Sequence, residues 1–150
     1  MKKTQRGFYI VGLIIVAGII GVLTSIGNPL YNDYMTRAKV AEALTLLGVL
    51  KNPMVEYYNK RNEWPPIAKV DGKTTGRYTS TIVQGGPETW PNNGSQYFYV
   101  EATMKGPGEL DNKKLRMTYT PSTKDWDCTV EALEDAAIPN KFLPSYCRSN

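Results

Sequence analysis

The hydrophobic and polar positions divide the chain into two unlike parts. From Phe8 to Ile26 the sequence FYIVGLIIVAGIIGVLTSI has 19 residues that are apolar, small or hydroxyl-bearing, and no charged side chain occurs between Phe8 and Asp33. A helix that crosses a membrane needs about 20 such residues. A helix that is apolar on every face must be buried, in lipid or against other helices. The stretch therefore predicts a membrane span over Phe8–Ile26. Lys2, Lys3 and Arg6 precede it and would keep this end in the cytoplasm.

After Pro29 the pattern becomes amphipathic. Apolar residues recur at spacings near three, four or seven, the stripe of a helix with one buried face; they are Val40, Leu44, Leu47, Met54 and Tyr58. The two patterns predict one helix from Phe8 to about Tyr58, roughly 75 Å long at about 1.5 Å per residue. Pro29 lacks an amide donor, so the segment from Gly21 to Pro29 is where a break or bend is expected.

The rest of the chain has the pattern of short strands separated by turns. Prolines and glycines between residues 65 and 76 indicate a loop, and residues 85–94 indicate a turn. Strands are expected at 77–83, 96–104, 115–120 and 125–130. Four such strands predict one antiparallel sheet packed on the amphipathic half of the helix, an α+β fold.

Composition excludes several kinds of chemistry. The chain has 150 residues, 18 Lys and Arg against 14 Asp and Glu, two cysteines and no histidine. Three of the 18 positive residues lie in the first seven positions, and the nearly neutral remainder does not indicate a nucleic-acid binder. A zinc site needs about four Cys or His ligands, and a Ser–His–Asp system needs histidine. No nucleotide-binding motif is present. We therefore expect neither an enzyme nor a metal or cofactor site.

Cys128 and Cys147 have eighteen residues between them. They could be two free buried thiols, but a domain exported across the membrane favours a disulfide. Closing such a loop would stabilise the fold by roughly 3 kcal/mol. The loop contains two prolines and three carboxylates, so we expect it to lie at the surface; these residues are Glu131, Glu134, Asp135, Pro139 and Pro144.

The N-terminal third also carries a family resemblance. A short basic leader ends in Gly7, Phe8 opens an apolar helix, and a proline is followed by an Asn-Asp-Tyr sequence. The run from Gly7 to Leu44, about a quarter of the chain, resembles the N-terminal signature of the type IV pilins. The C-terminal FLPSYC, which closes a loop opened at DWDC, is similar to the disulfide-bounded end of that family.

The resemblance implies a long helix against an antiparallel sheet, and the following processing. A prepilin peptidase would cut between Gly7 and Phe8, and Phe8 would be N-methylated. Pro29 falls on the family's helix-breaking proline, and Tyr31, Tyr34 and Arg37 also match. The implied division is a leader at 1–7, a transmembrane and filament-core helix at 8–35, and a globular domain at 36–150.

The same resemblance implies partners and location. The chain would pass through the inner membrane and then join other pilin subunits in an extracellular pilus, with the help of the prepilin peptidase and the pilus assembly machinery. The filament would serve adhesion, motility, DNA uptake or secretion. The disulfide loop would contribute to subunit contacts or receptor adhesion.

Gly12 departs from the family pattern. The family usually has a glutamate at the fifth position after the cut, thought to neutralise the N-terminal amine of a neighbouring subunit. A buried amine without a counter-charge is costly. Three explanations stay open: a minor or tip subunit, less efficient assembly, or an altered major-pilin sequence.

Two further alternatives also stay open. Ser25 and Gly27 imitate the small-residue pattern of an ordinary signal-peptidase site, which would release a secreted, disulfide-bonded binding module, although the apolar stretch is too long for a signal peptide. Residues 56–64, EYYNKRNEW, combine aromatic and basic side chains that could contact nucleic acid. Such a stretch is more often the end of a core helix with a solvated face.

Overall fold

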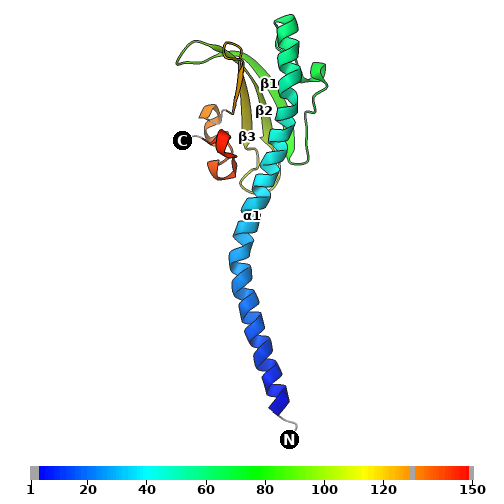
Figure 1. Ribbon diagram of the computed structural model, residues 1–150, viewed down its shortest axis with the longest axis vertical. Helices are drawn as coiled ribbons and strands as arrows, with labels where there is room; N and C mark the ends of the chain where they lie inside the picture. The colour runs from blue at the N-terminus through cyan, green and yellow to red at the C-terminus, as the bar shows by residue number, and fades with distance from the viewer. Residues whose placement is uncertain (1–3, 129–130, 149–150) are drawn as a thin grey trace. The chain divides into compact units, whose positions relative to one another are not determined.

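The computed structural model describes the backbone of residues 4–128 and 131–148, and their side chains except at 4–8, 26–30, 131–132 and 134. The chain forms two compact units, Met1–Met35 and Thr36–Asn150. The order of elements is a helix, a short 3-10 turn, four strands and three more 3-10 turns (Figure 1). This is the α+β arrangement that the sequence predicts.

The helix α1 runs from Thr4 to Arg61. The prediction was a helix from Phe8 to about Tyr58. The observed helix extends further at both ends, into the basic leader at Thr4 and past Tyr58 to Arg61. The break expected at Pro29 is not found, since residues 21–29 are helical throughout. Proline removes one amide donor from the hydrogen-bond ladder. The turns before it carry additional bonds, from the Thr24 hydroxyl to the carbonyls of Ile20 and Gly21 and from the Ser25 hydroxyl to the carbonyl of Val22.

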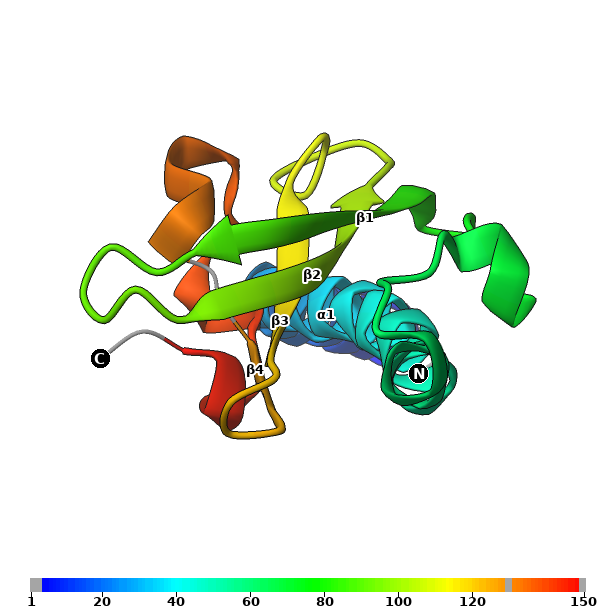
Figure 2. The same ribbon diagram turned by 90° about the horizontal axis from the view of Figure 1, so that it is seen from above.

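In the second unit, four strands form one antiparallel sheet in the order β1-β2-β3-β4. Their bounds are Thr79–Thr89 for β1, Gln96–Met104 for β2, Lys114–Thr120 for β3 and Asp125–Cys128 for β4. One face of the sheet lies against α1 (Figure 2). The predicted four-stranded sheet is confirmed.

The core of this unit lies between the sheet and residues 36–61 of α1. Val40, Leu47 and Met54 of the predicted stripe are fully buried, and Leu44 packs beside them. Alternate residues of two strands face the helix, because side chains in a strand point to opposite faces in turn; they are Val100, Ala102 and Met104 of β2, and Leu115, Met117 and Tyr119 of β3.

One predicted turn is instead part of a strand. Residues 85–89 belong to β1, whose pairing with β2 shifts register between Gly85 and Glu88. A bulge of this kind keeps a strand paired through a local irregularity. Gly85 suits the position because the ring of Tyr99 lies where a Cβ would stand. The sequence signal of a Gly-Gly-Pro turn therefore marks a bulge.

The C-terminal segment is also placed differently from expectation. It follows β4 as three short 3-10 helices, η2 (Glu131–Ala136), η3 (Asn140–Phe142) and η4 (Ser145–Cys147). We expected a surface loop. Its apolar side chains are instead buried; they are Leu133, Ile138, Phe142 and Leu143. Ile138, Phe142 and Leu143 belong to the same core cluster as the buried residues of α1 and β3.

Candidate functional site: an uncovered apolar helix and a C-terminal groove

The first unit presents an apolar helix surface that no other described residue covers. Every large apolar side chain from Tyr9 to Leu23 is at least 55% exposed. Burying such side chains stabilises by about 25 cal/mol per Å² of apolar surface removed from water. Since contiguous apolar patches of this kind mark contact sites, the arrangement is suited to burial against lipid or other helices. Among the residues described, no helix is long and apolar enough to cross a membrane.

The predicted processing residues lie at the start of this helix. Gly7 and Phe8 have helical backbone, but their side-chain environments fall outside the described residues, as does that of Ile26 at the other end of the predicted span. Gly12 is described. No heavy atom comes within 4 Å of the position where its Cβ would stand. It helps to line a shallow hollow of about 390 Å³ with Tyr9, Leu13 and Val16.

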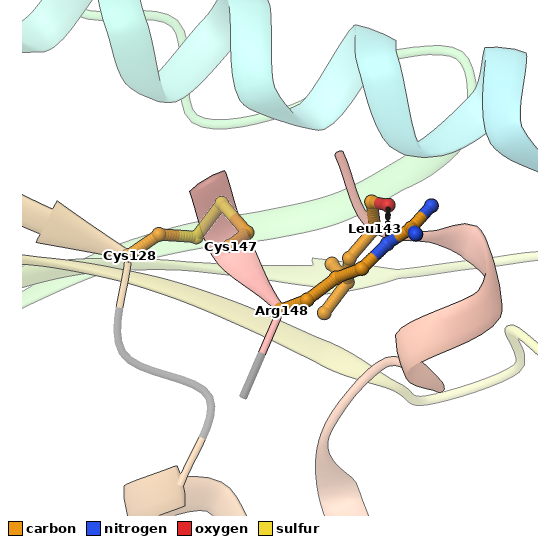
Figure 3. The surroundings of a disulfide bond; sticks show 4 residues. All are labelled: Cys128, Leu143, Cys147 and Arg148. Atoms are coloured by element: carbon orange, nitrogen blue, oxygen red, sulfur yellow. Dashed lines mark hydrogen bonds between the residues drawn. A yellow bond between two sulfur atoms is a disulfide. The ribbon is translucent and has the colours of Figure 1, made fainter. Parts of the chain in front are cut away.

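The two cysteines of the second unit are joined. The Cys128 and Cys147 sulfurs are 2.08 Å apart and their Cα atoms 5.0 Å apart. The bond ties the end of β4 to η4, and Cys147 is only 2% exposed. Next to it, the Arg148 side chain turns back and its Nε donates to the Leu143 carbonyl at 2.9 Å (Figure 3). The C-terminal segment is thus fixed by a covalent bond, by core packing and by this hydrogen bond.

A groove lies between this segment and α1, within the second unit. We call it the arginine groove, because an arginine stands on each of its two sides. Its volume is about 240 Å³, and it is lined by Arg37, Val40, Ala41 and Leu44 of α1 and by Phe142, Leu143, Pro144 and Arg148. Arg37 was noticed from the sequence only by resemblance. Phe142, Leu143 and Arg148 were not predicted, since nothing in the sequence indicates that residues 142–148 meet the helix.

The other sequence candidates do not come together as a site. In the stretch 56–64, Glu56 forms an exposed ion pair with Lys60 at 2.6 Å, and the Arg61 guanidinium stacks over the ring of Tyr57. These charged side chains therefore interact with neighbours on the same helix. Of the carboxylates in the disulfide loop, the side chains of Glu131 and Glu134 are outside the described residues. Asp135 accepts a bond from Lys113 Nζ through its backbone carbonyl.

We call the second unit, Thr36–Asn150, the head. The fold and these surfaces define a class of protein: a subunit whose apolar helix and disulfide-fixed head are suited to assembly. Comparison with known proteins gives the family. A profile of the pilin family, described as bacterial filament, matches residues 36–148. The chain belongs to the pilin family.

Relatives match over nearly the whole chain. The fimbrial protein EcpC of Eikenella corrodens is 33% identical, covering 99% of this chain and 94% of its own length. The type IV major pilin PilE of Neisseria gonorrhoeae is 32% identical over 100% of this chain and 98% of its own. A fimbrial protein of Neisseria meningitidis serogroup A is 36% identical, with 99% and 96% covered. The similarity to these proteins therefore covers both units of the chain.

Proposed function

We propose that this chain is the structural subunit of a type IV pilus filament. The similarity to type IV major pilins over both units supports this most directly. The exposed apolar surface of α1 from Tyr9 to Leu23 supports it physically, because that surface needs to be covered. In the filament, helices of neighbouring subunits would cover it. Its role is assembly and not catalysis.

We further propose the order of events. The uncharged stretch from Phe8 first anchors the chain in the inner membrane, with the basic leader on the cytoplasmic side. A prepilin peptidase then cuts between Gly7 and Phe8, Phe8 is N-methylated, and the assembly machinery adds the subunit to an extracellular pilus. The disulfide suits this route, since disulfides persist outside the cytosol.

Immunoelectron microscopy of a deletion strain complemented with this chain tests the filament role. We expect an antibody against the head to label filaments along their whole length. Label confined to filament ends would indicate a minor or tip subunit. Filaments without label would contradict the proposal.

Mass spectrometry of the mature N-terminus tests the processing. We expect an end at Phe8 that carries one extra methyl group. An end at Asn28 would indicate release by ordinary signal peptidase and a secreted binding module.

The deletion strain and the complemented strain, compared for attachment, surface motility and DNA uptake, would assign the role of the filament.

A further inference from the structure

The arginine groove combines an apolar floor with two positive sides. Val40, Phe142 and Leu143 on its floor are at most 3% exposed, whereas Arg37 and Arg148 on its sides are exposed. Ala41, on the helix side, is exposed as well. A ligand for this groove would have an apolar surface to lie on the floor and a negative charge to meet the arginines.

Within the described residues each guanidinium group is held by a bond through Nε, and such a bond does not use the two outer nitrogens. Arg37 donates through Nε to the Lys141 carbonyl at 3.0 Å, and Arg148 donates through Nε to the Leu143 carbonyl at 2.9 Å. Figure 3 shows the end of the Arg148 side chain extending past that carbonyl. Within the described part of the chain, the ion pairs involve neither arginine. The two remaining nitrogens of a guanidinium can grip a carboxylate end-on with two parallel bonds.

This chain itself carries a segment with matching chemistry. Asp33 is exposed and takes part in no ion pair among the residues described. Tyr31 and Tyr34 beside it are 63% and 70% exposed. The two rings share a helix face because they are three residues apart, whereas Asp33 is turned about 100° from Tyr34 around the helix axis and lies on a neighbouring face. The segment from Tyr31 to Tyr34 thus offers the exposed Tyr34 ring and, on the next face of the helix, one carboxylate.

We propose that the arginine groove of one subunit receives the Tyr31–Tyr34 segment of a second copy, with Tyr34 on the apolar floor and Asp33 paired with Arg148. The inference rests on the proposed filament function and names a contact within it. Groove and segment are different surfaces, so the contact is head-to-tail. Repetition of a head-to-tail contact that does not close gives an open filament and not a closed dimer.

A charge exchange tests the pairing. Arg148→Glu and Asp33→Arg should each lower the amount of the chain in sheared filaments at least tenfold. The double variant should return to within threefold of wild type, because the opposite charges are restored in exchanged positions. Lys73→Glu, the same charge change at an exposed lysine outside the groove, should leave the filament yield unchanged. A double variant as poor as the single variants would overturn the proposal.

Cross-linking tests the contact directly. Tyr34→Cys and Ala41→Cys are combined, and filaments are treated with a short bis-maleimide, which leaves the Cys128–Cys147 disulfide untouched. Every subunit then carries both thiols, so a head-to-tail contact should give a ladder of covalent multimers. Each single variant can give dimers at most. Intact filaments of the double variant that yield no ladder would overturn the proposal. If the double variant makes no filaments, the charge-exchange experiment decides whether the contact exists. Wild-type chain absent from every filament would instead contradict the proposed function.

Discussion

At the scale of single residues, Glu101 is a carboxylate inside the sheet. It lies in the middle of β2, is 4% exposed, and faces away from α1. Its Oε2 accepts bonds from Arg116 at 2.7 and 3.0 Å, and its Oε1 lies 2.9 Å from Lys114. The Arg116 guanidinium also stacks on the ring of Tyr99, 4.0 Å from its centroid. A buried carboxylate is stable here because two cations of β3 share it.

Replacing this carboxylate by an amide should destabilise the head. Glu101→Gln removes the charge while keeping the shape, and leaves Arg116 partly buried without its partner. We expect the free energy of unfolding to fall by roughly 1.5–3 kcal/mol, the range for hydrogen bonds to charged groups. Urea unfolding of the detergent-solubilised full chain measures it. Glu56→Gln is the matched control, because its ion pair with Lys60 is exposed and should contribute nothing measurable. Equal effects of the two substitutions would contradict the argument.

Tyr97 makes the stability of the head depend on pH in the alkaline range. Its hydroxyl donates to Glu88 and its ring packs on Trp90, with centroids 4.4 Å apart. Burial, followed by the hydrogen bond to the Glu88 carboxylate and its negative charge, raises the pKa of Tyr97 to about 12. A free tyrosine has a pKa near 10, so the folded state retains a proton that the unfolded state has lost between these values. This contribution to stability is complete below about pH 10 and is lost as the pH rises through about 12.

Tyr97→Phe should therefore change the pH dependence of stability as well as its value. The wild-type chain should lose stability between about pH 10 and 12 faster than the variant does, so the difference between them should shrink over that interval. Denaturant unfolding at several pH values measures this difference. Tyr146→Phe is the control, since that side chain is 69% exposed and should leave the profile unchanged. A constant difference between wild type and Tyr97→Phe up to pH 12 would contradict the assignment.

At the scale of elements, the disulfide and the C-terminal segment act together. The segment from η2 to η4 contributes Ile138, Phe142 and Leu143 to the core. The Cys128–Cys147 bond fixes its end against β4. Because the arginine groove has one wall from this segment, its shape depends on the bond.

Removing the disulfide should destabilise the head and open the groove. Cys128→Ser together with Cys147→Ser should lower the free energy of unfolding by about 3 kcal/mol, the chain-entropy value for a loop of this length. Hydrogen exchange followed by mass spectrometry should show faster exchange in residues 137–148 than in the wild type, with little change in β2. A uniform increase across the sheet would contradict a local role for the bond.

The sequence predicts regular elements better than the segments between them. The helix and the four strands follow from periodic apolar positions, and β2 begins and ends where the pattern predicts, at Gln96 and Met104. Residues 85–89 were expected to turn, because local glycine and proline signals cannot reveal that β2 continues to pair alongside them. Prolines and charges likewise made residues 131–147 look exposed, as Asn140, Lys141 and Tyr146 are. The burial of Ile138, Phe142 and Leu143 depends on packing against α1, about a hundred residues earlier in the chain.

The same limit applies to the candidate site. The N-terminal residues were predicted because a long uncharged stretch can be recognised directly in the sequence. The arginine groove could not be predicted in this way, because it forms only where residues 37–44 and 142–148, far apart in the sequence, come into contact. The break expected at Pro29 shows the opposite error, while the alternative of a bend there stays a prediction. Proline is a strong local signal, yet the backbone around it is helical, since a single missing donor leaves the rest of the ladder in place.

At the scale of the whole molecule, filament assembly must cover the apolar helix, and the proposed cut before Phe8 would add a new amine that the filament has to accommodate. From Phe8 to Asn32 the chain has no side chain that could neutralise this amine in a neighbouring subunit. An unpaired charge in a water-poor environment is costly, although burying a carboxylate to pair with it also carries a desolvation cost. Gly12 leaves open space on the helix surface, so a larger side chain fits the isolated subunit without a clash.

Gly12→Glu should therefore raise the amount of this chain in sheared filaments, because its carboxylate would lie near the Phe8 amine of a neighbour. The substitution also removes a glycine from a helix, which by itself stabilises the helix by roughly 0.5–1 kcal/mol. Gly12→Ala is the control that separates the two effects, since it improves helix propensity without adding charge. Filament content that rises with Glu and not with Ala supports charge pairing. An equal rise with both assigns the effect to the helix, and no change with either means that the filament tolerates Gly12, as a minor or tip position would.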